Sequence, residues 1–511
     1  MSQYSTIPRP LLWIKIHDTP TPFVEYLLLS STLFEDLRRQ NPWWRGHTWE
    51  STDRQLSALA RARFSYDPKP LAGIRPGNVY SLLGPRRVGK STAAKNAIRR
   101  LLDSGYPPLR VVYHSCDLLT GAADIAALLS TVYDEAELAG SLAGPDQPFF
   151  LFLDEIQRVP DWQQAIKHLH DTHRLGDDCV VLTGSSARDL RAGSELLPGR
   201  RGRALDRDRL LLPMSFRDFV TAVEPGVTLP PGDVTPTDLA NAYQPNSHVR
   251  KEFTRPRIVA ALDHLVELFE LYSRIGGFPG AVGDYLRTGE IEMATMTEMW
   301  DVIRGDLNRY QQVRDATIPL KILERLALNL ASPVSWQKIA REAAVDIKTV
   351  QTYVDLFTDA YLFLVVHRSD EGTLARRADK KIYPVDPLIA GMAAVATGRP
   401  RFVPDISLAA ESILGVSLFR AVTGDDFMTF GIQQGVLYHR TGTNREVDFI
   451  VGRDRVPFES KYGNNVERRD AQVMERSFGR GVLMTRRTLN LDGASVLIPA
   501  PLVLAALRNS A

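Results

Sequence analysis

Short apolar runs alternate with helix-length segments between about residues 76 and 215. The runs cover residues 78–84, 109–116, 148–156, 179–186 and 209–215. They are apolar throughout rather than at every second position, which is typical of strands covered on both faces. The alternation with helical segments predicts a parallel sheet with helices on each side, and therefore an α/β domain.

The pattern changes after this region. Residues 216–310 have helical character, interrupted by Gly276, Gly277 and Pro279. Residues 318–368 then predict three helices and a strand, which is the order of a winged helix-turn-helix. Ser335 and Asp346 are expected to cap the second and third of these helices. From about residue 372 the chain is rich in strand-like runs, so we expect an α/β protein of several domains.

Composition narrows the picture further. The 511 residues are 44% apolar and 24% charged, with 62 basic and 60 acidic side chains. The length suggests three or four domains, and the balanced charge means that any nucleic-acid contact must come from local basic clusters. Cys116 and Cys179 lie in apolar runs and indicate core residues in a reducing compartment. We find neither a secretory signal nor a run long enough to cross a bilayer, so we expect a cytoplasmic protein without a membrane partner.

The segment GPRRVGKS, residues 84–91, carries the clearest chemistry. It matches G-x-x-x-x-G-K-[ST] between an apolar strand and a helix. Gly84 and Gly89 let the backbone turn its N–H groups toward phosphate oxygens, Lys90 adds charge at the β- and γ-phosphates, and Ser91 offers a hydroxyl to Mg²⁺. A glycine-rich turn that binds nothing is the alternative. The predicted nucleotide-binding residues are Gly84, Pro85, Arg86, Arg87, Val88, Gly89, Lys90, Ser91, Thr92 and Ser185.

Three further residues extend this site. Asp154 ends the run FFLFLD and is expected to hold the Mg²⁺, while Glu155 is expected to polarise the attacking water. Ser185 (or Thr183), at the end of the next strand, could contact the γ-phosphate. Arg200 follows a helix and could reach a neighbour's γ-phosphate in a homo-oligomer, or it could belong to a simple basic loop.

Several motifs of this chain, taken together, resemble those of a known protein family. NPWW, LLGPRRVGKST, FLDEIQRV, LTGSSA, LPGRRGRALDRDRLLLPMSFRDF and GGFPG together resemble a prokaryotic family of AAA+-type ATPases. In that family the ATPase precedes a winged-helix segment and a C-terminal domain of unknown function. The resemblance implies a P-loop sheet with a helical lid, and it places Lys90, Ser91, Asp154, Glu155 and Arg200 on matching motif positions.

The third helix of the predicted winged helix would expose Lys348, Thr349, Gln351 and Thr352. These side chains suit contact with phosphates or base edges, so DNA is an expected partner. Many modules of this kind instead pack domains together or bind protein, and that alternative stays open.

The C-terminal third holds a second candidate site. A helix with Glu411, a strand with Asp448 and a strand with Glu459 and Lys461 follow in an order that resembles the PD-(D/E)xK nuclease fold. Asp448 and Glu459 would hold a second divalent ion, Mg²⁺ or Mn²⁺, Glu411 would complete its shell, and Lys461 would orient the hydroxide. Solvated charges on a hairpin are the alternative.

The expected domains are an N-terminal region with an aromatic cluster (1–75), an AAA+-type P-loop core (76–215), a helical lid (216–310), a winged helix-turn-helix (311–371) and a restriction-endonuclease-like α/β domain (372–511). The expected function is an ATPase, with ATP and Mg²⁺, that couples its nucleotide state to DNA contact and to a nuclease-like domain. The alternative is a non-cutting ATP-driven switch whose C-terminal domain binds a protein partner or DNA.

Overall fold

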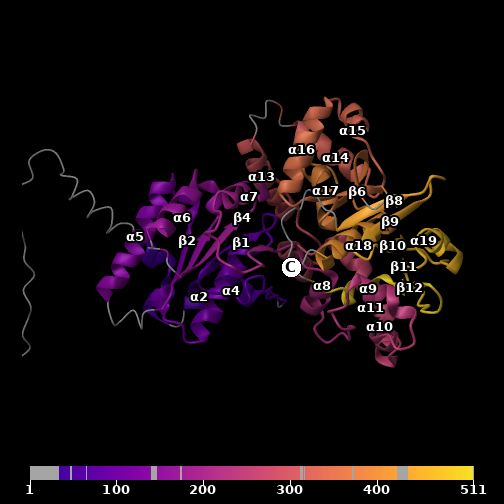
Figure 1. Ribbon diagram of the computed structural model, residues 1–511, viewed down its shortest axis with the longest axis horizontal. Coiled ribbons are helices and arrows are strands. Elements are labelled where there is room, and N and C mark those ends of the chain that lie inside the picture. Colours follow the sequence, from indigo (N-terminus) through magenta and orange to yellow (C-terminus); the bar gives the residue numbers. More distant parts are fainter. Residues whose placement is uncertain are drawn as a thin grey trace, which may run out of the picture.

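The computed structural model describes residues 34–46, 49–64, 66–139, 147–172, 175, 177–310, 315, 317–370, 373–422 and 435–509. Residues 1–33 of the expected N-terminal region lie outside this set, as do residues 311–314, 371 and 372 at the expected domain boundaries. The chain folds into two lobes (Figure 1). We call residues 34–215 the first lobe and residues 216–509 the second lobe.

The first lobe is built on a five-stranded parallel sheet with the order β2-β3-β4-β1-β5. The strands are β1 (Asn78–Leu83), β2 (Val111–Ser115), β3 (Phe150–Asp154), β4 (Cys179–Gly184) and β5 (Asp208–Leu210). The helices between them are α4 (Lys90–Asp103), α5 (Ala122–Ala139), α6 (Trp162–Asp171) and α7 (Ala187–Glu195). Every residue of β3 and β4 is buried. The predicted parallel α/β sheet is thus confirmed.

The aromatic segment before this sheet covers its edge strand. It forms η1 (Pro42–Arg45), α2 (Trp49–Thr52) and α3 (Arg54–Arg61). The Asn41 side chain exchanges two hydrogen bonds with the backbone of Tyr113 on β2, of 2.6 and 2.9 Å. Trp43 donates its indole N–H to the carbonyl oxygen of Val111 (2.9 Å) and is only 3% exposed. The segment therefore satisfies and shields a sheet edge that would otherwise be open.

The helices of residues 216–310, expected as a lid, contact two different parts of the protein. Its helices are α8 (Phe216–Val223), α9 (Pro236–Ala240), α10 (His248–Phe253), α11 (Pro256–Ile275), α12 (Pro279–Thr288) and α13 (Met293–Tyr310). Both α8 and α11 pack on the C-terminal helix α20 (Ala500–Ala506), and Arg217 donates to the carbonyl oxygen of Ala505 at 2.6 Å. Figure 1 accordingly shows α8 to α11 in the second lobe, beside the strands of its sheet. Side chains of α12 and α13 lie beside the loop of residues 84–91.

Three helices and a hairpin follow in the predicted order. They are α14 (Thr317–Leu328), α15 (Trp336–Ala343), α16 (Ile347–Asp359), β6 (Phe363–Asp370) and β7 (Thr373–Pro384). Ser335 and Asp346 cap α15 and α16 by accepting backbone N–H groups, as predicted. That this unit is a winged helix which contacts DNA stays a prediction.

The second lobe contains a mixed seven-stranded sheet with the order β12-β11-β10-β9-β8-β6-β7. Its remaining strands are β8 (Val436–Arg440), β9 (Glu446–Val451), β10 (Val456–Lys461), β11 (Gly481–Thr485) and β12 (Ser495–Pro499), and its helices include α17 (Pro387–Ala396), α18 (Ile406–Val422) and α19 (Gln472–Phe478). Because β6 pairs in parallel with β8, the sheet crosses the boundary expected at residues 371 and 372. The helical unit and the C-terminal domain therefore share one sheet.

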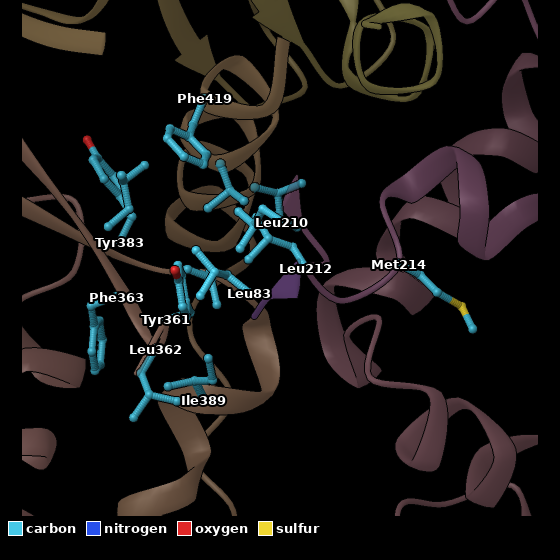
Figure 2. Close-up of a cluster of buried hydrophobic side chains, with 14 of the residues drawn as sticks. Leu83, Leu210, Leu212, Met214, Tyr361, Leu362, Phe363, Tyr383, Ile389 and Phe419 are labelled. Atoms are coloured by element: carbon cyan, nitrogen blue, oxygen red, sulfur yellow. The ribbon is translucent and has the colours of Figure 1, made fainter. Parts of the chain in front are cut away.

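The two lobes meet at Gly277. Its N–H donates to a carboxylate oxygen of Asp386 (2.6 Å), and its carbonyl oxygen accepts the N–H of Met214 (2.9 Å). One apolar cluster contains both Leu212 of the first lobe and Phe419 of α18, and Figure 2 shows part of it. A shared core and a direct backbone hydrogen bond thus join the first lobe to the second lobe.

Asp386 gives this junction a pH-dependent stability. Burial raises the pKa of Asp386 to about 6, against its hydrogen bonds from Gly277 and Leu388. A carboxyl whose pKa is raised on folding stabilises the fold below its unfolded pKa, and this contribution is lost as the pH rises through the folded value. A rise of roughly two units corresponds to about 3 kcal/mol. We expect the unfolding free energy of Asp386→Asn, relative to the wild type, to increase by about that amount between pH 4 and pH 7 in urea titrations.

The matched control for this prediction is Asp405→Asn. Asp405 also caps a helix, because it accepts the N–H of Ser407, but it is exposed. This variant removes a capping carboxylate from the surface and leaves the buried Asp386 in place. Equal pH slopes for wild type and Asp386→Asn would contradict the prediction.

Candidate functional site

The loop of residues 84–91 lies between β1 and α4, and two glycines shape it. Gly84 has a φ of 152°, and a Cβ atom there would lie 2.0 Å from the carbonyl oxygen of Leu211. Gly89 is left-handed, with a φ of 103°, and stands at the N-cap of α4 without a side chain to cap the first turn. The backbone N–H groups at the start of α4 are therefore oriented to meet an anion.

Lys90 folds back over this loop. Its Nζ atom donates to the carbonyl oxygens of Gly84 and Pro85, each at 2.9 Å, and the residue is 5% exposed. Ser91 and Thr92 are half-buried in the first turn of α4, and Val88 is buried. The structure thus brings the predicted phosphate-binding residues into one loop, while their roles stay predictions.

Asp154 is held in place by two hydroxyl groups. Tyr113 donates to its Oδ2 atom (2.6 Å), and Thr183 donates to its Oδ1 atom. Burial, together with the nearby Asp154, raises the pKa of Tyr113, so its phenol remains a donor. These bonds orient a carboxylate at the end of β3. The sequence did not single out Tyr113, which reaches Asp154 from the neighbouring strand β2.

Glu155 points back to the nucleotide loop. It has a left-handed backbone, with a φ of 55°, and its N–H donates to the Thr183 hydroxyl (3.1 Å). Its Oε2 atom lies 2.6 Å from the Arg86 guanidinium and 2.5 Å from Nε2 of Gln157. Gln157 also lies 3.4 Å from the hydroxyl of Ser185. A chain of polar contacts therefore runs from the loop through Glu155 to the end of β4.

Arg200 lies apart from this network. Its guanidinium forms two bonds to the carboxylate of Asp171 on α6, of 2.7 and 3.1 Å. The adjacent Arg201 is buried and makes a two-point contact with Asp208, of 2.6 and 3.0 Å. Arg200 is therefore half-buried and held by Asp171, while Arg203 of the same loop is exposed, and the action of Arg200 on a neighbour's phosphate stays a prediction.

A cavity of about 520 Å³ opens beside the loop. Its walls come from the end of α3 with the segment after it, from the loop and α4, and from α12. They include Phe64, Tyr66, Val88, Thr92, Gly280 and Gly283. This cavity was not predictable from sequence patterns, because its walls come from three segments that are far apart in the chain. Its position and apolar character suit the base and sugar of a nucleotide whose phosphates lie on the loop.

The carboxylates predicted for the C-terminal site surround a lysine that the prediction omitted. Lys381 of β7 places its Nζ atom 2.7 Å from Glu411, 3.0 Å from Asp448 and 2.6 Å from Glu446. The Tyr383 hydroxyl donates to Glu411 at 2.8 Å. Burial, with the nearby Asp448, raises the pKa of Glu411 to about 7. Side chains from β7, β9 and α18 thus form one buried ionic cluster.

The remaining predicted pair lies on β10. Lys461 Nζ is 2.9 Å from an oxygen of Glu459, and the Lys461 side chain is half exposed. Burial raises the pKa of Glu459. The other carboxylate oxygen of Glu459 is buried and has no hydrogen-bond partner. Among the described residues, no group of three or more His, Cys, Asp or Glu side chains is arranged to hold a metal ion.

Helix α16 presents the side chains predicted to face DNA. Lys348 and Gln351 are exposed, while Thr349 and Thr352 are half-buried. The Thr349 hydroxyl donates to the capping carboxylate of Asp346 (2.7 Å), and that of Thr352 donates to the backbone of Lys348 (2.9 Å). Lys348 and Gln351 therefore have the clearest access to a partner.

Comparisons with known families agree with the first lobe. Residues 76–220 match a family described as an AAA domain, and residues 266–399 match a domain of unknown function, DUF8612. Together with the parallel sheet, the first match supports an AAA-type P-loop fold for residues 76–220.

Two similar proteins are uncharacterized proteins of Methanocaldococcus jannaschii. MJ1544 is 23% identical over 356 residues, which are 68% of this chain and 67% of that protein. MJ1637 is 25% identical over 288 residues, so this chain spans 56% of its length.

Solved structures also show a detectable likeness to this chain. The Aeropyrum pernix ORC1 protein in complex with DNA has a TM-score of 0.27 and 16% identity, covering 75% of this chain and 94% of that one. A Thermotoga maritima RuvB variant has a TM-score of 0.22 and 14% identity, covering 59% and 83%. No helix within the described part of the chain combines the length and apolar character needed to cross a membrane.

Proposed function

We propose that this protein binds and hydrolyses ATP and transmits its nucleotide state to a DNA-contacting helical unit in the second lobe. The observation that carries the proposal is the loop of residues 84–91, with the buried Lys90 folded over it and Asp154 and Glu155 beside it. The match of residues 76–220 to an AAA domain supports the same activity.

The residues of the loop suit a triphosphate with its magnesium ion. Hydroxyl and carboxylate oxygens are the ligands that Mg²⁺ prefers, and Ser91 and Asp154 would supply one of each. When bound, Mg²⁺ neutralises charge on the phosphate oxygens. The N–H groups at the start of α4 would hold the phosphates in position, and the Lys90 ammonium would contact the β- and γ-phosphates.

Glu155 would activate the attacking water. In the structure its carboxylate is bound by Arg86 and Gln157. A phosphate arriving on the loop would compete with Glu155 for the Arg86 guanidinium, because a phosphate forms stronger charge-assisted bonds. Release from Arg86 would leave the carboxylate free to accept a proton from water. Nucleotide binding would therefore prepare the base for catalysis.

The path to the second lobe runs through the helices after the sheet. Arg87 of the loop pairs with Glu298 of α13 at 2.9 Å, and α12 borders the cavity beside the loop. Gly277, just before α12, is bonded to Asp386, just before α17. If nucleotide binding moved α12, the Gly277–Asp386 hydrogen bond would transmit that movement to the seven-stranded sheet that carries the helical unit.

For the C-terminal domain, two roles remain from the sequence. The order of α18, β8, β9, β10, α19 and β11 supports a relationship to the PD-(D/E)xK fold. The ammonium of Lys381 among its carboxylates favours the alternative without cleavage. We therefore propose an ATP-driven switch whose C-terminal domain binds DNA or a protein partner.

DNA binding tests the second half of the proposal. We expect the double variant Lys348→Ala with Gln351→Ala to bind duplex DNA more weakly, because it removes one phosphate contact and one polar contact from α16. The slope of log affinity against log salt should become shallower by about one. Fluorescence anisotropy over a salt series measures both quantities, and ATP turnover without DNA should not change.

Lys321→Ala is the matched control, since Lys321 is an exposed lysine on α14 of the same unit. Its DNA affinity should stay within about twofold of the wild type. The opposite result would be a wild type that hydrolyses ATP but binds no DNA at any salt concentration. That result would exclude DNA as the partner of the switch and leave a protein as the partner.

A further inference from the structure

We propose that Lys381 is a built-in cation that takes the place of a divalent metal ion in the C-terminal carboxylate cluster, so that this cluster takes up no divalent metal ion. The proposal does not depend on the nucleotide site of the first lobe.

The Lys381 ammonium lies among three carboxylates and donates hydrogen bonds to two of them, Glu411 and Asp448. A lysine ammonium has three N–H donors. Lys381 has three carboxylate partners, Glu411, Asp448 and Glu446, at 2.7, 3.0 and 2.6 Å. These distances are those of charge-assisted hydrogen bonds, whereas Mg²⁺ lies about 2.0–2.1 Å from its oxygens. The carboxylate oxygens of the cluster therefore surround the Lys381 nitrogen, which occupies the position that a metal ion would take.

Burial makes this arrangement hard to open. The Lys381 side chain is only 1% exposed, and those of Glu411 and Asp448 are each 13% exposed. Removing one charge from a buried ion pair leaves its partners uncompensated at a large energetic cost. A metal ion that entered would have to expel the ammonium, which sits in the sheet with its nitrogen 5.9 Å from the ring centroid of Tyr438.

Two further donors also bind the carboxylates of the cluster. The backbone N–H of Ser460 donates to the second oxygen of Asp448 at 2.9 Å, and Tyr383 donates to Glu411 at 2.8 Å. Burial alone would lower the pKa of Lys381, but Tyr383 and the surrounding carboxylates outweigh burial and raise it. Lys381 therefore stays charged and bound.

Lys461, the lysine expected to serve catalysis, lies outside this cluster. It is half exposed and pairs with Glu459. Two lysines thus form ion pairs with the acidic side chains of this domain. Lys381 is buried among three carboxylates, and Lys461 is half exposed beside Glu459. A site that must admit a metal ion and water needs open coordination positions, and the contacts of Lys381 occupy those of Glu411 and Asp448, whereas the second oxygen of Glu459 has no hydrogen-bond partner.

Thermal unfolding of nucleotide-free protein tests the proposal with paired variants. The Tm of the wild type should be the same in EDTA and in millimolar Mn²⁺ or Ca²⁺. Lys381→Ala should show a large fall in Tm in EDTA, and the ions should restore at least half of that fall, because the variant leaves both space and unpaired carboxylates. Lys381→Met should show a similar fall without restoration, because the methionine side chain fills the space.

Lys380→Met is the matched control, since Lys380 is the neighbouring residue of β7 and its ammonium lies over the ring of Trp336. It should change Tm by little, in EDTA or in metal. Failure of the ions to restore Lys381→Ala where it folds, or restoration of Lys381→Met, would overturn the proposal.

Direct metal binding keeps the proposal testable even if the Lys381 variants do not fold. Free Mn²⁺ can be counted by electron paramagnetic resonance in titrations of wild type and Asp448→Asn. We expect the two isotherms to coincide. An additional Mn²⁺ ion bound by the wild type and lost in Asp448→Asn would show that the carboxylates accept a metal, and the assignment of Lys381 as its replacement would be wrong.

Discussion

ATP turnover by Lys90→Ala is expected to fall at least about 100-fold, because the substitution removes the positive charge that would stabilise the transferring phosphate. The Lys90 ammonium lies against the carbonyl oxygens of Gly84 and Pro85 and is nearly buried. From this position a small rotation of the side chain would bring it to a phosphate on the loop. The measurement is steady-state phosphate release at saturating ATP and Mg²⁺.

Lys167→Ala provides the control, since Lys167 is an exposed lysine on α6 of the same lobe. Its turnover should equal that of the wild type. Thermal unfolding should confirm that Lys90→Ala is folded, because alanine is compatible with the first turn of a helix. Wild-type turnover in a folded Lys90→Ala protein would remove the loop from the mechanism, and with it the first half of the proposed function.

The position of the loop of residues 84–91 between a strand and a helix was predictable because the pattern is local. The residues of GPRRVGKS are consecutive, and the strand and helix on either side have clear apolar patterns, so the sequence fixes their geometry with few long-range contacts. Asp154 and Glu155 were predictable for a related reason, since parallel strands end at one edge of a sheet. Their partners Tyr113 and Gln157 were not, because a tyrosine on a buried strand has no sequence feature that shows where its hydroxyl points.

The C-terminal cluster shows the opposite case. Glu411, Asp448 and Glu459 stand out in the sequence because carboxylates at strand and helix positions match a known order. Lys381 lies before all of them in the chain, on strand β7, which begins just after the expected domain boundary. Only the path of β7 along α18 brings it to these carboxylates. Sequence patterns indicate which charges could meet a metal ion, while tertiary packing decides whether another side chain already compensates them.

Two glycines before α12 illustrate how a motif can be recognised before its physical role is clear. Gly276 and Gly277 interrupt a helical pattern, which by itself indicates a turn. The structure shows that a Cβ atom at position 276 would lie 2.0 Å from the carboxylate of Asp386, and one at position 277 would lie 2.3 Å from the carbonyl oxygen of Met214. Both glycines are therefore required by close approach, Gly276 to Asp386 within the second lobe and Gly277 to Met214 of the first lobe.

Gly277→Ala is accordingly expected to lower the free energy of unfolding by about 3 kcal/mol or more. The new methyl group would meet the N, C and O atoms of Met214 at 2.9, 3.0 and 2.3 Å, and these backbone atoms cannot turn away as a flexible side chain would. The shift needed to relieve the overlap would also strain the hydrogen bonds to Met214 and Asp386. Urea unfolding followed by fluorescence measures the loss.

The control is Gly280→Ala, on the first turn of α12, where the new Cβ atom would meet only the Thr295 side chain at 3.5 Å. Alanine favours the helix there, so this variant should be as stable as the wild type or more stable by up to about 1 kcal/mol. If Gly277 joins the lobes as proposed, Gly277→Ala should also weaken any effect of ATP on DNA binding at temperatures where it remains folded. Equal stability of the two glycine variants would show that the lobes tolerate separation at this point, and the path from the nucleotide loop to the seven-stranded sheet would have to run elsewhere.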